Sequence, residues 1–134
     1  MGTWGPGSFE NDHASDWVFD LEESDGLPFL EQSIEAVAAL GDDYLEAHVA
    51  ESAIAAAETL ACLRGRPGKN LTESLENWLA ANSQDVPSGL LQRAQAALER
   101  VQRPPSELLE LWEESAEFSN WQDSMQNLVR RLKG

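Results

Sequence analysis

The sequence predicts an all-α fold, a compact bundle of about seven helices, from three observations. Apolar residues recur every three or four positions along most of the chain, which places them on one side of a helix. β-Branched residues are sparse and nowhere alternate with polar ones, as a half-buried strand requires. The segments between these apolar stripes are short, which is typical of antiparallel helix neighbours.

The first helix is expected from about Asn11 to Glu23, because Asn11 or Asp12 can cap its free N–H groups. A second helix is expected to start at Pro28, whose missing N–H suits the first turn, and to stop before Gly41. The apolar stripes of these two helices comprise Ala14, Trp17, Val18, Leu21, Leu30, Ile34, Val37 and Ala38.

The third helix is expected from about Asp43 to Arg64, with Asp43 and Glu46 at capping-box spacing and Gly65 after its end. Its interior reads AESAIAAAETLACL and is rich in alanine on several faces. Small side chains let other helices approach closely, so this helix is predicted to be central. The basic residues that follow are expected to complement its C-terminal end; they are Arg64, Arg66 and Lys69.

Four further helices are expected in the C-terminal half. Asn70 with Glu73 forms the predicted cap of the fourth, and one of two adjacent prolines, Pro104 and Pro105, is a predicted start of the sixth. Ser119 and Gln122 have capping-box spacing for the seventh. The apolar residues of these helices include Leu75, Trp78, Leu90, Leu98, Val101, Leu108, Leu111, Trp112, Trp121, Met125, Leu128 and Leu132.

The length of 134 residues predicts a single helical domain, 1–134, made of an N-terminal arm (1–10) and a bundle (11–134). No run approaches 18 apolar residues, and the N-terminus lacks the features of a secretory signal. Cys62 is the single cysteine, and its neighbours offer no cation that would activate a thiolate. We therefore expect a cytoplasmic protein.

Charge is distributed unevenly along the chain. Residues 1–63 hold 14 Asp and Glu and no Lys or Arg, a formal charge of −14, whereas residues 64–134 hold 10 acidic and nine basic side chains, a charge of −1. The total of −15 repels phosphate backbones and anionic membranes, so neither nucleic acid nor a membrane is an expected partner. A basic protein partner or a divalent cation would be attracted, although solubility alone also explains an acidic surface.

Two groups of polar residues could carry chemistry, since the standard catalytic motifs are absent from the sequence. The first is a polar strip on the third helix, formed by Tyr44, His48, Glu51, Glu58 and Cys62. Glu51 and Glu58 are expected to be partly buried there and to need partners.

The second group pairs His13 and Asp16 with His48 and Glu51, each pair three residues apart as in metal sites of helix bundles. These four residues are the candidates for a divalent metal site between the first and third helices. On the helical wheel, however, His13 and Asp16 lie opposite Trp17, towards solvent, where ordinary surface residues are expected. No cofactor is otherwise predicted.

Three carboxylates form a row on the first helix, four residues apart: Asp12, Asp16 and Asp20. Like charges at this spacing cost some stability when nothing neutralises them. The row is therefore either an ordinary solvated face or a docking surface for Arg or Lys of a partner.

The stretch WGPGSFENDHASDW, residues 4–17, resembles the N-terminal signature of a bacterial family known as domain of unknown function 4259. Residues 43–68 and 106–115 are similar to further parts of that family. The resemblance implies a bacterial origin but no activity. Family members tend to have an acidic residue near the position of His48, which leaves Glu51 and Glu58 as the better-matched polar positions.

The Gly/Trp-rich segment MGTWGPGSF is predicted to be an ordered arm that packs on the central helix, since glycine allows close backbone approach. Trp4 and Phe9 would anchor it, and Glu51 or Glu58 would accept hydrogen bonds from Trp4 Nε1–H or from the arm's backbone. Alternatively, the arm is a lid over a small site. The candidate binding residues are accordingly Trp4, Asn11, Asp12, Asp16, Glu51 and Glu58.

The leading functional hypothesis is a non-enzymatic, acidic interaction or regulatory protein, immunity- or antitoxin-like by analogy of charge alone. The alternative is a metal-dependent hydrolase that uses the carboxylate and histidine residues between the first and third helices. A third possibility is a domain that forms part of a larger assembly.

Overall fold

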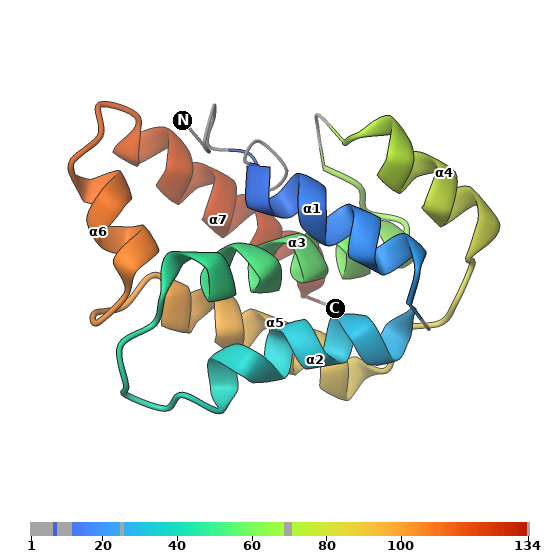
Figure 1. Ribbon diagram of the computed structural model, residues 1–134, viewed down its shortest axis with the longest axis horizontal. Helices are drawn as coiled ribbons and strands as arrows, with labels where there is room; N and C mark the ends of the chain where they lie inside the picture. The colour runs from blue at the N-terminus through green and yellow to red at the C-terminus, as the bar shows by residue number, and fades with distance from the viewer. Residues whose placement is uncertain (1–6, 8–11, 25, 69–70, 134) are drawn as a thin grey trace.

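The computed structural model describes residues 7, 12–24, 26–68 and 71–133, and these form an all-α bundle (Figure 1). The described part contains seven helices in chain order and no strand apart from a single bridge between Leu45 and Ser106. The helices are α1 (Asp12–Glu22), α2 (Leu27–Ala38), α3 (Ala47–Leu63), α4 (Glu73–Ala81), α5 (Ser88–Val101), α6 (Glu107–Glu113) and α7 (Phe118–Leu132). None of them is long and apolar enough to cross a membrane, as far as the described residues go.

The alanine-rich α3 is the central helix, as predicted. It runs through the middle of Figure 1 and contacts α1, α2, α5, α6 and α7. Its fully buried alanines let these neighbours pack closely on several sides; they are Ala50, Ala53, Ala55, Ala56, Ala57 and Ala61. The predicted apolar stripe of α1 is buried against α3 and α4, with Ala14 and Leu21 fully covered.

The end of α3 is set by Gly65, as predicted. Gly65 has a φ of +85°, which glycine adopts without steric cost. Its N–H donates to the carbonyl of Cys62 and the N–H of Arg66 donates to that of Ala61, which together form a Schellman motif. Gly41, predicted to stop α2, also has a positive φ of +57°, although α2 itself ends at Ala38.

The start of α3 differs from the prediction. The helix begins at Ala47, not Asp43, and its N-cap residue Glu46 makes no capping hydrogen bond with its side chain. Instead, Leu45 is held in extended backbone by the loop before α6, and Glu107 accepts a hydrogen bond of 2.8 Å from the N–H of Ala47. A residue 60 positions away in sequence therefore caps α3, which short-range spacing does not reveal.

Three other predicted helix starts are also corrected. Thr72 caps α4 by accepting from the N–H of Leu75, while the predicted cap Asn70 lies outside the described residues. Ser106, rather than a proline, caps α6. In α7 the N-cap is Glu117, so Ser119 lies inside the helix and its predicted capping box does not form.

Arginine side chains tie distant loops to helix ends. Arg100 is buried on α5 and donates to four backbone carbonyls, those of Gly41, Asp43, Arg103 and Pro105. Arg64 and Arg66 donate to the carbonyls of Leu132 and Lys133. Arg64 and Arg66 thus complement the C-terminal end of α7, not that of α3 as predicted, because their side chains reach across to the adjacent helix.

Candidate functional site

The outer face of α1 presents a row of carboxylates to solvent. Asp12, Asp16 and Asp20 are exposed and lie four residues apart, as the sequence indicated, and Glu22 and Glu23 extend the acidic surface at the end of the helix. The row faces outward because the opposite side of α1 carries the buried residues Ala14, Trp17, Val18 and Leu21.

None of these five carboxylates forms an ion pair with a Lys or Arg within the described part of the chain. The acidic residues of α2 differ, since Glu31 and Glu35 both bind the guanidinium of Arg93, at 3.3 and 2.7 Å. Asp42, after α2, similarly contacts Arg103 at 3.4 Å. The carboxylates of α1 therefore retain more of their negative field than those of α2.

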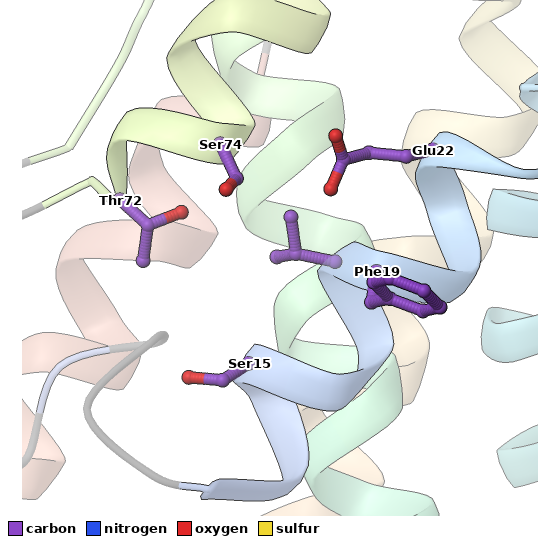
Figure 2. A pocket seen from close by; sticks show the side chains of 6 residues that line it. Ser15, Phe19, Glu22, Thr72 and Ser74 are labelled. Atoms are coloured by element: carbon purple, nitrogen blue, oxygen red, sulfur yellow. The ribbon is translucent and has the colours of Figure 1, made fainter.

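An exposed aromatic ring, that of Phe19, lies among the α1 carboxylates. Phe19 is 62% exposed and borders a groove of about 200 Å³ between α1 and the start of α4. Figure 2 shows Ser15, Phe19 and Glu22 on the α1 side of this groove and Thr72 and Ser74 on the α4 side. Val18 completes the lining. The α1 surface thus combines negative charge with an accessible apolar edge.

His13 does not point to solvent, which corrects the prediction from the helical wheel. It lies in the first turn of α1, at the edge of the contact with α3, where Ser52 is within reach. Its Nε2 lies 2.7 Å from Oγ of Ser52, and its ring meets the ring of His48 edge-on with centroids 5.9 Å apart. Burial, and then the nearby His48, lower the pKa of His13, while Asp16 and Asp20 oppose this shift.

The structure brings His13 and His48 together but does not complete the predicted metal centre around them. Within the described ranges, no three side chains of His, Cys, Asp or Glu are grouped so that they could hold a metal ion. Asp16 is exposed, and Glu51 is half-buried, so that burial raises its pKa. The two imidazoles alone are a minimal ligand set compared with the three or four protein ligands typical of zinc.

The residues of the polar strip predicted on α3 differ in burial, which increases from Tyr44 to Glu58. Tyr44 lies before the helix, exposed, and donates to Glu110 over 3.1 Å, while His48 is exposed as well. Glu51 is half-buried, and Glu58 is buried, as expected for a residue at the packed centre of α3.

Glu58 binds Arg131 of α7, a partner that the sequence pattern did not reveal. Arg131 Nη2 donates to Glu58 Oε1 over 2.8 Å, and Arg131 Nη1 donates to Glu58 Oε2. The N–H of Gly68 also donates to Glu58 Oε2, over 3.1 Å. A Cβ atom at Gly68 would lie within 3 Å of both carboxylate oxygens and of Arg131 Nη2, so a side chain at this position would have to displace the ion pair. The carboxylate links α3, α7 and the loop after α3.

Cys62 lies beside this ion pair and is not an activated thiol. Burial, together with the charge of Glu58, raises its pKa to about 11, so the neutral thiol predominates at pH 7. This agrees with the expectation that the thiol of Cys62 is not activated. Two other candidate residues, Trp4 and Asn11, lie outside the described residues, and so does the arm except for Gly7. The packing of the arm on α3 stays a prediction.

A comparison with protein families identifies the chain. The family model described as a domain of unknown function (DUF4259) matches residues 2–124. The chain belongs to the DUF4259 family. No curated protein and no solved structure matches this chain.

The match to DUF4259 covers the α1 row, Phe19 and the groove as well as Glu58. Arg131 lies beyond the matched residues, although it binds a carboxylate within them. Phe19 was not among the predicted site residues, and a signal for it was present: it is a large apolar residue outside the stripe of α1, flanked by acidic side chains. Exposure of a single apolar residue is common, and it is the groove beside Phe19 that gives it significance here.

Proposed function

We propose that this DUF4259 protein is a non-enzymatic interaction module whose acidic α1 face binds a basic protein partner. The observation that supports this most is the absence of cationic partners for the α1 carboxylates in the described chain, next to the paired carboxylates of α2. A carboxylate that already binds an arginine of its own chain attracts a cationic partner weakly. A carboxylate without such an ion pair keeps its negative field and attracts a cationic partner more strongly.

The proposed binding stabilises the α1 row in two ways. Asp12, Asp16 and Asp20 repel one another at their four-residue spacing, and cationic side chains of a partner would remove that repulsion. Charge-assisted hydrogen bonds from Arg or Lys would then replace water around the carboxylates. The charge of −14 on residues 1–63 would also attract a basic partner from a distance and raise its association rate.

The same field argues against other classes of macromolecular partner. Nucleic acids and anionic membranes carry negative charge, so their approach to α1 would be repelled. A basic protein is therefore the partner class that we propose, with an immunity- or antitoxin-like role as an analogy from charge alone. We further propose that the protein acts in the cytoplasm.

A binding assay with matched charge variants tests the proposal. The tagged protein and the variant Asp16→Asn/Asp20→Asn are used to capture partners from the native host at low and at high salt. We expect a basic protein that binds the wild type, dissociates as salt rises, and binds the variant more weakly. The control variant Glu113→Gln/Glu114→Gln changes two exposed carboxylates at the end of α6 and should retain the partner. Equal capture by both variants would contradict the proposal.

The alternative function, a metal-dependent hydrolase at the α1–α3 contact, draws on one observation, the approach of His13 to His48. Its candidate ligands remain His13, Asp16, His48 and Glu51. The test is metal analysis of protein purified without chelator, together with thermal unfolding in the presence of Mn²⁺, Zn²⁺ or Mg²⁺. Stoichiometric metal and a higher melting temperature would favour this alternative; their absence would remove it.

A further inference from the structure

We infer that the groove between α1 and α4 receives an apolar side chain of the basic partner, so that the segment recognised is an amphipathic, basic helix. This inference rests on the proposed function, and it adds an apolar contact to the charge-based binding of the partner. Four observations carry it: the size of the groove, the exposure of Phe19, the composition of the lining and the charge of the surrounding surface.

The size of the groove suits one anchoring side chain. Its volume of about 200 Å³ is below the range of about 300–1,000 Å³ that is usual for small-molecule and cofactor sites. Its apolar lining residues are Phe19 and Val18, and Ser15, Thr72 and Ser74 contribute hydroxyls to the lining. Figure 2 shows Thr72 and Ser74 across the groove from Ser15 and Phe19. An inserted apolar side chain would therefore contact the apolar atoms of the α1 side of the groove, where Phe19 lies, with polar groups beside it, as in interface hot spots.

The negative charge around the groove favours a bound segment that carries Lys or Arg next to its apolar residue. Glu22 belongs to the lining itself, and Asp16 and Asp20 flank Phe19 on the same helix. Across the groove, Glu73 in the first turn of α4 adds a further exposed carboxylate next to Ser74. An apolar anchor within this acidic rim needs Lys or Arg on both sides of it, which a helix supplies at intervals of three or four residues.

The same charges disfavour a second copy of this chain as the occupant. Two α1 faces would bring two rows of carboxylates together, and the chain has a net charge of −15. Sedimentation should therefore report a monomer at low salt. A dimer that dissociates in the variant Phe19→Ser would assign the groove to self-association and overturn the inference. Tighter peptide binding after removal of residues 1–9 would assign it to the chain's own N-terminal segment.

Two synthetic helical peptides serve as probes. One contains lysines and a stripe of leucines spaced every three or four residues; the other has the same lysines with serine in place of leucine. Calorimetry measures their affinity for the wild type at low and at high salt. We expect the leucine peptide to bind more tightly than the serine peptide at both salt concentrations, since apolar burial is not screened by salt.

Two variants of the protein locate the apolar contact. Phe19→Ser should lower the affinity for the leucine peptide by about tenfold or more, and it should have little effect on the affinity for the serine peptide. Leu111→Ser is the matched control, because Leu111, although predicted to pack, is 52% exposed on α6. This variant should bind like the wild type. Circular dichroism should show the same helix content in both variants.

The outcomes separate this inference from the proposed function. If both peptides bind equally and Phe19→Ser changes neither affinity, the inferred apolar contact in the groove is wrong. The proposed binding of a basic partner by the α1 carboxylates would still stand. If the leucine peptide binds through Phe19 but Asp16→Asn/Asp20→Asn has no effect at low salt, the charge-based function fails instead. If neither peptide binds, both are overturned.

Discussion

Charged residues have opposite roles in α1 and in the region where α3, α7 and the loop after α3 meet. In α1 the carboxylates face solvent without a cationic partner among the described residues. In the second region four charged side chains are used within the molecule: Glu58 binds Arg131, and Arg64 and Arg66 bind the carbonyls at the end of α7. The comparison teaches that the arginines of this acidic chain mainly hold the fold together, which leaves α1 uncompensated.

The largest expected effect comes from removing the buried carboxylate. Glu58→Ala leaves Arg131, whose side chain is 17% exposed, without its carboxylate partner in a largely dry position. Breaking a buried pair on one side typically costs about 3–5 kcal/mol of the free energy of unfolding. Urea denaturation measures this loss. A loss comparable to that of an exposed pair would show that the region does not depend on this contact.

A double variant distinguishes loss of the pair from loss of packing. Glu58→Met/Arg131→Met replaces both charges by apolar side chains, so no unpaired charge remains. We expect it to be more stable than Glu58→Ala by a clear margin. If both variants are equally unstable, the ion pair itself is not the cause.

Substitution of Gly68, which lies against the Glu58–Arg131 ion pair, should have the next largest effect on the free energy of unfolding. A Cβ atom at Gly68 would lie 2.8 Å from Glu58 Oε2 and 2.9 Å from Arg131 Nη2, so Gly68→Ala must displace the pair. Overpacking of this kind costs about 1–3 kcal/mol. Gly89→Ala on α5 is the control, since a Cβ atom added there would meet no neighbouring side chain or loop of the described chain within 4 Å, and alanine is the better helix former. It should be neutral or slightly stabilising in the same urea assay.

A smaller effect is expected at the contact of α1 with α3 on acidification. Because the pKa of folded His13 lies below its usual value of 6.5, the unfolded chain binds a proton more readily. The contribution of His13 to stability is therefore complete above pH 6.5 and declines as the pH falls towards the lowered pKa. The raised pKa of Glu51 acts in the opposite direction at lower pH, so the comparison with His13→Gln is needed to isolate the histidine.

An NMR titration of the two histidines checks this directly. The wild type should show His13 titrating below its usual pKa, and His48→Gln should bring the value of His13 closer to normal, because one cause of the shift is removed. An unshifted His13 in the wild type would contradict the contact with α3.

The smallest effects compare the two acidic helices themselves. Asp16→Asn removes a repelling charge on α1 and should change the free energy of unfolding by only about 0.2–0.5 kcal/mol, in the stabilising direction at low salt. Glu35→Gln removes the ion pair with Arg93 and should be slightly destabilising, because both side chains are exposed to solvent. Thermal and urea unfolding at two salt concentrations measure both. Effects of the same sign would mean that α1 is compensated after all.

Much of this fold could be predicted from the sequence, because each helix carries a stripe of apolar residues whose spacing is a local property. The central place of α3 followed from its alanines, and the burial of Glu58 followed from its position there. The predicted start of α3 was wrong because its cap comes from Glu107, and the direction of His13 was wrong because Ser52 lies on another helix. Arg131 could not be assigned to Glu58 for the same reason: the two are 73 residues apart, and only the packing of α7 on α3 brings them together.

The affinity of the lysine–leucine peptide for charge variants tests the central claim most directly, namely that α1 is the uncompensated, binding face of the molecule. Calorimetry at low salt compares the wild type, Asp12→Asn/Asp16→Asn/Asp20→Asn and the α6 control Glu113→Gln/Glu114→Gln. We predict a marked loss of affinity for the α1 variant and none for the control. Equal affinities for all three proteins would contradict the account.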